Sequence, residues 1–203
     1  MVYKTDYIAD RLEKSEDKEE KDPLVIAPKP DLDKLKKENT ASVDLRLGTW
    51  FCSLRRARMA LVEENNNSDI QIIKHHYVPF GDIFYLHPGS FVLGITMEWL
   101  RMPQDLAAYV IGKSSWGRRG LIIATATGVH PSYIGCLTLE LSNVGEMPIA
   151  IKPGMHICQL FFESAKGFRK DTKFGGKFIG NRKPSLGIIK ADSIAEKLAK
   201  AYH

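Results

Sequence analysis

The sequence contains no long hydrophobic run. Across its 203 residues no apolar stretch is long enough to cross a bilayer, and the charged first residues lack the apolar core of a signal peptide. We therefore expect a protein that has no membrane partner and stays in the cytoplasm. Its three cysteines lie far apart and form no C-x-x-C pair, which argues against a disulfide framework and against a structural zinc site.

A block of charge of one sign is also missing. The formal net charge of +5 permits a polyanionic ligand, but lysines and arginines are interleaved with acidic residues along the chain. This pattern gives no reason to expect a nucleic acid partner. With 44% hydrophobic residues, a chain of this length is typical of one globular domain with a buried core.

Residues 1–40 differ in composition from the rest of the chain. They carry charges of alternating sign and few apolar residues. We expect a charged, solvated extension with a short helix near residues 4–15 and a strand at Leu24–Ala27. A partner-binding arm is the alternative interpretation of this extension.

Residues 41–163 are predicted to form a β core. Short runs rich in Val, Ile, Leu, Phe and Tyr follow one another at strand spacing. Pro88-Gly89 and Pro153-Gly154 each separate two apolar runs, and we expect each of them to close a hairpin. Residues 164–203 are predicted to be a basic, glycine-rich tail that ends in a helix over DSIAEKLAKAYH. The fold class is therefore all-β, a sandwich or barrel with short helices near both ends.

The stretch AAYVIGKSSWGRRGL contains Gly112-Lys113-Ser114, the last three residues of a nucleotide-binding P-loop. The complete motif needs another glycine five residues before Gly112, so that backbone N–H groups can wrap the phosphates. That position is Ala107, and the bulky residues after it indicate a strand that runs into a turn. Two interpretations remain, a phosphate-binding turn of another kind and a solvated basic turn, for the group Lys113, Ser114, Ser115, Arg118 and Arg119.

The run CLTLELSN is typical of a strand with one apolar face. Three leucines alternate with the polar residues Thr138, Glu140 and Ser142. Glu140 is therefore either a solvent-facing strand residue or a carboxylate directed into a ligand cleft. The polar turn GVHPSYIG before it and the basic turn one hairpin upstream favour the cleft, because together they would combine an anion clamp with a base.

Four motifs in fixed order carry a family resemblance. SVDLRLG, GKSSWGRRGL, VHPSYIGCLTLELSN and KPGMHICQL resemble, in order and spacing, the dCTP deaminases of the dUTPase superfamily, over most of residues 24–190. The resemblance implies a distorted β-barrel or jelly-roll that assembles as a homotrimer, with active sites at subunit interfaces. It also implies dCTP as substrate, Mg²⁺ bound through the triphosphate, and no zinc. The H-x-E and P-C-x-x-C pattern of zinc deaminases is accordingly not found in the sequence.

The resemblance also implies catalytic residues. Glu140 matches the family's catalytic glutamate, a general acid and base. Ser114, Ser115 and Arg118 match the family's Arg-Ser-Ser-x-x-Arg motif, in which Lys113 replaces the first arginine and keeps the charge without the bidentate fork. The pair Thr125 and Ala126 resembles the segment whose backbone contacts the base and the water. The implied catalytic group is Glu140, Ser114, Arg118 and Ala126.

Further residues are implied to bind the nucleotide. Tyr133 matches the aromatic residue that packs on the deoxyribose. Lys177 and Asn181 resemble the lysine and amide that close over the nucleotide. The remaining implied contacts come from the entry turn and from the strand itself: His130, Thr138 and Leu139.

The predicted reaction is the hydrolytic deamination of dCTP to dUTP and ammonia, with Glu140 carrying the proton transfers. A dUTP diphosphatase, or an enzyme with both activities, is the first alternative; that branch activates water with an aspartate where this chain has His130. The second alternative is a catalytically silent nucleotide-sensing regulator, whose partner-binding arm would be the charged N-terminal extension. The presence of Glu140 together with Ser114 and Arg118 argues against a silent protein.

Overall fold

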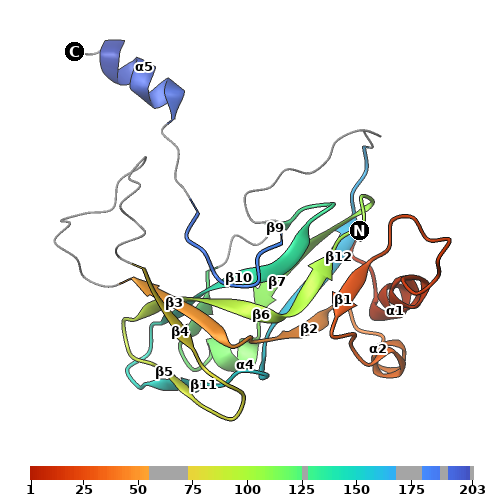
Figure 1. The fold of residues 1–203 in the computed structure, drawn as a ribbon, viewed down its shortest axis with the longest axis horizontal. Helices are drawn as coiled ribbons and strands as arrows, with labels where there is room; N and C mark the ends of the chain where they lie inside the picture. Colours follow the sequence, from red (N-terminus) through yellow and green to blue (C-terminus); the bar gives the residue numbers. More distant parts are fainter. Residues whose placement is uncertain (55–72, 125–127, 168–179, 188–191, 202–203) are drawn as a thin grey trace.

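The computed structural model describes residues 1–54, 73–124, 128–167, 180–187 and 192–201. Within them the chain forms three antiparallel sheets and four helices (Figure 1). The helices are α1 (Thr5–Lys14), α2 (Leu32–Glu38), α4 (Ser114–Gly117) and α5 (Ser193–Ala201). The strands are β1 (Val25–Ala27), β2 (Val43–Arg46), β3 (Trp50–Leu54), β4 (Ile73–Tyr77), β5 (Phe84–Leu86), β6 (Phe91–Arg101), β7 (Leu106–Gly112), β8 (Leu121–Ile123), β9 (Gly128–Val129), β10 (Ile134–Asn143), β11 (Ile149–Ile151) and β12 (His156–Ser164).

A six-stranded sheet and a four-stranded sheet make up most of the fold. The six-stranded sheet has the order β4-β3-β6-β10-β8, with β1 also paired to β6, and the four-stranded sheet has the order β2-β12-β7-β9. The third sheet is the pair β5 and β11. The mostly β class with short helices near both ends of the chain is confirmed (Figure 1), whereas the described strands do not close into a barrel.

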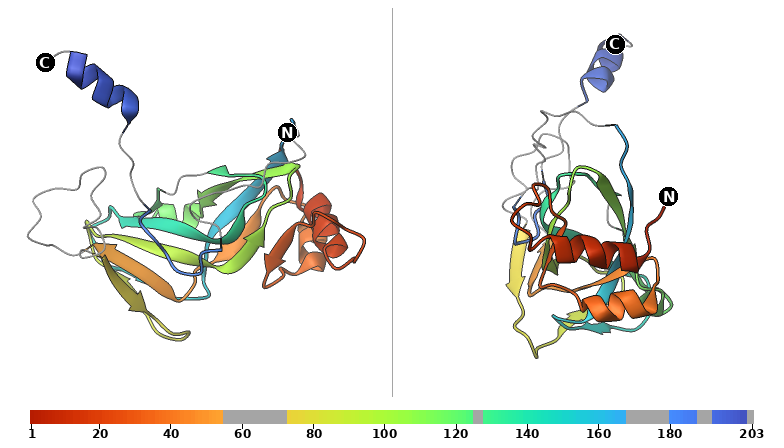
Figure 2. Two further views of the ribbon diagram at one scale, coloured as in Figure 1. Left: turned by 45° about the horizontal axis from the view of Figure 1, so that its top comes forward. Right: turned by 90° about the vertical axis from the view of Figure 1, so that its right-hand side faces the viewer.

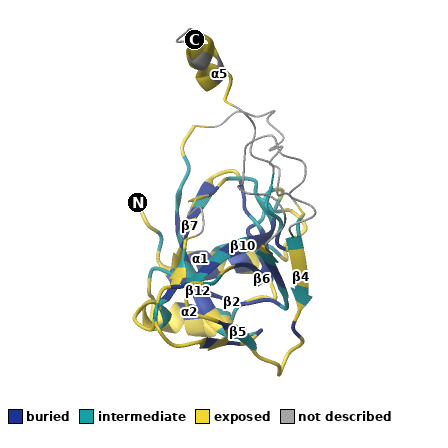
Figure 3. Ribbon diagram, turned by 90° about the vertical axis from the view of Figure 1, so that its left-hand side faces the viewer, coloured by how far each residue is buried: buried dark blue, intermediate teal, exposed yellow. Residues whose placement is uncertain are grey.

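Alternation along the strands builds the hydrophobic core. β10 and β12 bury side chains at every second position, among them Leu139, Leu160 and Phe162. The polar residues Thr138 and Glu140 of β10 are only half-buried, because they lie on the opposite face of the strand. Figure 3 shows the buried segments concentrated along the inner strands. The alternation predicted for β10 is therefore confirmed.

The N-terminal region packs against the sheets, so the expectation of a solvated extension is wrong. α1 and α2 lie side by side at one end of the molecule (Figures 1 and 2), and they bury Ile8, Leu12 and Leu35. Arg11 of α1 donates hydrogen bonds of 2.8 and 3.0 Å to the carboxylate of Asp105. The alternating charges thus belong to two amphipathic helices, whose outer faces are charged and whose inner faces join the core.

The predicted terminal elements are otherwise present. The N-terminal helix and strand are confirmed as α1 and β1, and the C-terminal helix is confirmed as α5, where Asp192 accepts the N–H of Ile194 at 2.8 Å. α2 was not predicted. It begins after Asp31, whose carboxylate accepts the N–H of Lys34 at 3.0 Å and satisfies a backbone donor of the first turn.

The two Pro-Gly turns do not close hairpins, and that prediction is wrong. Pro88-Gly89 joins β5 to β6, and Pro153-Gly154 joins β11 to β12; in both cases the two strands belong to different sheets. The N–H of Gly89 donates to Asn143 (2.8 Å) and that of Gly154 donates to Leu47 (2.7 Å). The turns therefore bond to residues that are distant in sequence, and they pass the chain from one sheet to another.

The β6–β10 ladder is irregular opposite Leu137, where three residues of β6 face one residue of β10. The hydroxyl of Thr96 bonds to both strands at this irregularity. It accepts the N–H of Leu137 and donates to the carbonyl of Glu98, both at 2.9 Å. Gly48 approaches the same bulge, and a Cβ there would lie 3.1 Å from the carbonyl oxygens of Ile95 and Thr96. The bulge thus joins β6 to the connection between β2 and β3.

Glu98 connects the two large sheets. Its side chain is 2% exposed, and its carboxylate accepts the backbone N–H of Arg46 at 2.8 Å and the guanidinium at 3.2 Å. Burial raises the pKa of the Glu98 carboxyl, and its bonds to Arg46 offset part of that change. The pair joins β6 to β2, at the cost of keeping a carboxylate away from water.

We expect Glu98→Gln to alter the dependence of stability on pH. A carboxyl whose pKa is raised by folding stabilises the fold below its unfolded pKa, and this contribution is lost as the pH rises through the folded pKa. Glutamine does not titrate, so the free energy of unfolding of the variant should rise relative to that of the wild type as the pH rises above about 4. Denaturant unfolding at a series of pH values measures the difference. A variant whose free energy of unfolding falls relative to that of the wild type as the pH rises would contradict the raised pKa of Glu98.

Candidate functional site

Glu140 lies near the middle of β10, where β8 ends beside it. Its side chain is half-buried, and its backbone pairs with Leu93 of β6 on one side. On the other side its carbonyl accepts the N–H of Ala124 at 2.9 Å. The next two residues, Thr125 and Ala126, lie outside the described residues. Ala124, the last described residue before this predicted segment, is thus bonded to the backbone of the predicted catalytic residue.

The basic turn forms α4 and its flanks. β7 runs directly into Lys113, which confirms the strand and turn expected there, and the carbonyl of Lys113 accepts the N–H groups of Trp116 and Gly117 at 3.0 and 3.1 Å. The side chains of Ser114, Ser115 and Arg118 are exposed. The turn therefore presents two hydroxyls and a guanidinium on the surface, a set that suits phosphate oxygens.

A close contact fixes the end of this turn against the end of β10. Gly120 has φ +90°, and a Cβ there would lie 2.7 Å from the nitrogen of Gly145. Its carbonyl accepts the N–H of Val144 at 2.9 Å. Asn143 is fully buried, accepts the N–H of Gly145 and donates to two carbonyls, so it holds the 143–147 turn in shape. Glycine is required at 120 because a side chain would meet backbone.

The basic turn and Glu140 stand at opposite ends of β8. Leu121, which follows the turn, pairs with Asn143, whereas Ala124 bonds to Glu140. A strand of three residues spans about 10 Å. Within one chain the backbones of the predicted anion clamp and of the predicted base are therefore separated by about the length of this strand.

Lys113 has an acidic partner that the sequence did not reveal as functional. Its ammonium lies 2.6 Å from the carboxylate of Asp44 on β2. Asp44 is part of the motif SVDLRLG, but nothing in that motif shows which residue it faces. The ion pair lies beside a cavity of about 280 Å³ between α2, β2 and β12.

The turn before β10 and the C-terminal tail come together. The hydroxyl of Tyr133 donates to the carbonyl of Cys136 at 2.8 Å, and burial raises the pKa of Tyr133 to about 12. The carbonyl of Asn181 accepts the N–H of Cys136 at 3.0 Å, and Gly180 donates to Ile134 at 2.7 Å. The structure therefore places two predicted nucleotide-binding residues, Tyr133 and Asn181, at the same end of β10.

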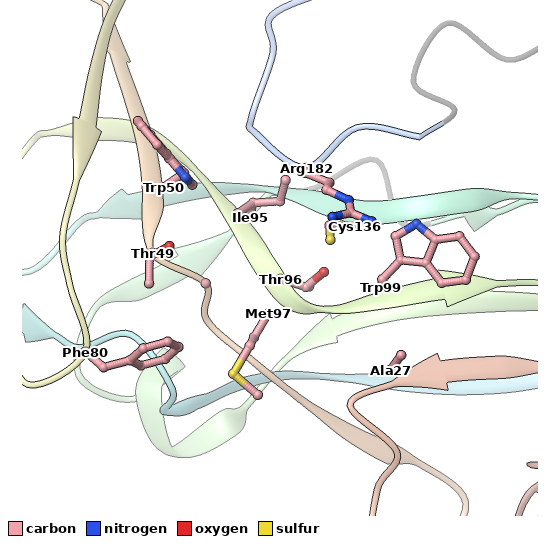
Figure 4. Close-up of a pocket in the computed structure, with 11 residues that line it drawn as sticks. Ala27, Thr49, Trp50, Phe80, Ile95, Thr96, Met97, Trp99, Cys136 and Arg182 are labelled. Carbon is pink, nitrogen blue, oxygen red and sulfur yellow. The ribbon is translucent and has the colours of Figure 1, made fainter.

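A groove with aromatic walls lies beside this tail segment. Its volume is about 590 Å³, and Figure 4 shows Trp50 and Trp99 along it, with Arg182 next to Cys136. The ammonium of Lys183 lies 4.0 Å from the centre of the Trp50 ring, a cation–π contact. Arg182 and Lys183 thus lie on the sheet that carries Glu140.

The other predicted site residues have different environments. His130 is exposed, and its carbonyl accepts the N–H of Tyr133 at 3.2 Å. Thr138 is half-buried on the face of Glu140, whereas Leu139 is fully buried in the core on the opposite face. Lys177 lies outside the described residues.

The described part of the chain has neither a cluster of metal ligands nor a helix of membrane-spanning length. No group of three or more His, Cys, Asp or Glu side chains in this part of the chain is placed to hold a metal ion. None of its helices is long and apolar enough to cross a bilayer. The three cysteines are free and buried.

Comparison with known proteins identifies the family. Residues 11–165 match the family model described as dCTP deaminase-like. The dCTP deaminase of Natronomonas pharaonis is 41% identical over 157 residues, which cover 75% of this chain and 80% of that protein. A protein of Dictyoglomus thermophilum named dCTP deaminase, dUMP-forming, is 38% identical over 173 residues, which cover 83% of this chain and 88% of that protein.

A solved structure shares the fold. The crystal structure of 2'-deoxycytidine 5'-triphosphate deaminase from Agrobacterium tumefaciens superposes with a TM-score of 0.58 at 22% identity, over 79% of this chain. The present chain spans 48% of the length of that chain, so the likeness concerns the fold alone. The family match and the curated relatives together show that the chain belongs to the dCTP deaminase-like family.

Proposed function

We propose that the protein hydrolytically deaminates dCTP to dUTP and ammonia, in the cytoplasm. The observation that carries the proposal is the position of Glu140, half-buried on the polar face of β10 and bonded through its backbone to Ala124. The relatives named dCTP deaminase support the same substrate. A carboxylate on a rigid central strand is well placed to act on a base that binds over the polar face of that strand.

The chemistry requires four proton transfers at one place. Water must lose one proton as it attacks C4 of cytosine, and the resulting hydroxyl must lose the second as it becomes the C4 carbonyl; the ring nitrogen gains one of these protons and the departing amino group gains the other. Glu140 carries all four in the proposed mechanism, alternating between carboxylate and carboxylic acid. A positioned general acid and base contributes about 10²–10⁴-fold, and the remaining acceleration comes from orientation and electrostatic stabilisation.

The basic turn has the complementary role. Ser114 and Arg118 hold the attacking water and stabilise the charge of the glutamate, and the turn as a whole binds the triphosphate. Mg²⁺ accompanies the triphosphate in this proposal and neutralises part of its charge. The side chains that the turn offers, two hydroxyls, an ammonium and a guanidinium, suit phosphate oxygens better than Mg²⁺, so phosphate oxygens and water would be the ligands of the ion.

A homotrimer resolves the separation of these groups. Because β8 keeps the basic turn and Glu140 of one chain at its two ends, a compact site forms when the turn of one copy approaches the β10 strand of another. We propose that each of three sites is built in this way. The tail segment around Asn181 would then be ordered further by the nucleotide.

The identity of the end product, dUTP or dUMP, is the first property to determine. Relatives named dUMP-forming make hydrolysis of dUTP the competing activity. We expect dUTP to be the end product, because exposed His130 stands where the diphosphatase branch resembled by the sequence uses an aspartate. Ammonia and pyrophosphate are followed separately with dCTP as substrate. Pyrophosphate release that equals ammonia release would contradict this expectation and make the protein bifunctional.

Replacing Glu140 by Gln tests the mechanism. The substitution keeps the size of the side chain but removes proton transfer, so kcat should fall by at least about 10²–10⁴-fold, while the affinity for dCTP stays close to that of the wild type. Ammonia release and calorimetry on the same variant measure the two quantities. Glu146→Gln is the matched control, since Glu146 is exposed in the turn after β10. A fully active Glu140→Gln protein would rule out the proposed mechanism.

Mixed oligomers test the composite site. Glu140→Gln and Arg118→Ala are each expected to be inactive as homo-oligomers. When the two variants are co-expressed in equal amounts and assort at random, about one quarter of all sites would combine an intact turn with an intact Glu140, so about that share of activity should return. No recovery in mixtures whose light scattering confirms a trimer would show that each site lies within one chain.

A further inference from the structure

The backbone of Lys113 is fixed at the junction of β7 and α4. Its N–H donates to the carbonyl of Ile157 on β12 at 3.1 Å, and its carbonyl accepts two N–H groups of the α4 turn. The residue has extended backbone angles, φ −68° and ψ 127°, and stands as the N-cap of α4. What remains variable is the direction of its long side chain.

Asp44 determines that direction. β2 and β7 flank β12, so the side chain of Lys113 crosses over β12 to reach Asp44, where Nζ and Oδ2 are 2.6 Å apart. Asp44 is itself held in the β2–β12 ladder, opposite Gln159. The side chains of Lys113 and Asp44 are 28% and 35% exposed, so water screens their attraction only in part.

The neighbouring cationic side chains form ion pairs with other carboxylates. Lys34 and Arg46 line the same cavity as Lys113. Lys34 lies 3.7 Å from Glu38, and Arg46 pairs with the buried glutamate of β6. The pairing of Lys113 with Asp44 is therefore specific, and a change at Asp44 acts first on Lys113.

Two opposing effects decide what Asp44 does when a triphosphate binds. As an anion it competes with phosphate for the ammonium, and as a fixed acceptor it holds the ammonium in one place. An ammonium group has three donors, so Lys113 can keep Asp44 and still donate to a phosphate oxygen. A lysine that is not held gives up side-chain freedom when it binds. Because solvent weakens repulsion between partly exposed groups, orientation outweighs competition.

We propose that Asp44 is a positioning residue that holds Lys113 for the triphosphate of the substrate. The inference rests on the proposed function, since it assumes that the basic turn binds a triphosphate. It gives a physical reason why lysine serves in place of arginine here. A guanidinium is planar and carries its own directional fork, whereas an ammonium needs a fixed partner to define its direction.

A double-mutant cycle tests this role. Asp44→Asn, Lys113→Ala and the double variant are assayed for KM and kcat with dCTP. Asp44→Asn should raise KM about three- to tenfold and leave kcat within about twofold of the wild type. In the Lys113→Ala background, where KM is already raised, the same substitution should leave KM unchanged. Lys113→Arg keeps a cationic partner for Asp44 and should retain the wild-type KM.

Three results would overturn the proposal: an unchanged KM for Asp44→Asn, a lowered KM, which would make Asp44 a competitor, or an equal rise in both backgrounds. Asp105→Asn is the matched control, because it breaks the ion pair with Arg11 at the other end of β7 and should leave KM unchanged. Thermal melting checks the fold of every variant. Asp44→Glu, which keeps the carboxylate, should restore much of the affinity, and Asp44→Ala replaces the asparagine variant in the cycle if that protein does not fold.

The same cycle separates this inference from the proposed reaction. If the wild-type protein does not turn over dCTP, the reaction is wrong, and the cycle is then run on the Kd for inorganic tripolyphosphate, measured by calorimetry. Coupling between Asp44 and Lys113 on that probe would support the positioning role without the reaction. A wild-type protein that does not bind tripolyphosphate, or a cycle without coupling, would overturn the role of Asp44.

Discussion

The pairing of β10 with β6 is the interaction on which both the core and the candidate site depend. Because side chains alternate, the register that buries Leu139 in the core also places Glu140 on the opposite face, and a slip of one residue would exchange them. Thr96 helps to fix this register, since its hydroxyl bonds to both strands at the bulge. Two residues later, Glu98 ties the same strand to Arg46 of the second large sheet. The packing of the core and the position of the Glu140 carboxylate are thus set by the same strand register.

Several cations near the candidate site already have partners. Lys113 pairs with Asp44, Arg46 pairs with Glu98, and Lys183 lies over the ring of Trp50. These three cations, all in the described part of the chain, therefore do not contribute to an open cationic surface. A polyanion gains most here if its oxygens match individual donors, which argues for a compact triphosphate rather than an extended nucleic acid backbone.

The sequence could predict the features that depend on local pattern. The alternation around Glu140, the terminal helices and the strand before Lys113 all follow from periodicity within a few residues. The partners of the Pro-Gly turns could not be predicted, because turn composition does not specify which sheet receives the next strand. Nor could the contact of Lys113 with Asp44, since 69 residues separate them. The requirement for glycine at 120 has the same origin, because the backbone it meets belongs to a distant turn.

The extended course of β8 also accounts for the division of the candidate site. The strand enters from the basic turn, pairs with the last residues of β10, and ends where Ala124 bonds to Glu140. β8 is extended, so within one chain it separates the backbone of the basic turn from that of Glu140 by about 10 Å. In the proposed homotrimer, a site shared between two copies would place the phosphate-binding and proton-transferring groups together without any change in either chain. It also gives a reason why Glu140 and Thr138, on the strand that anchors the core, are only half-buried in a single chain.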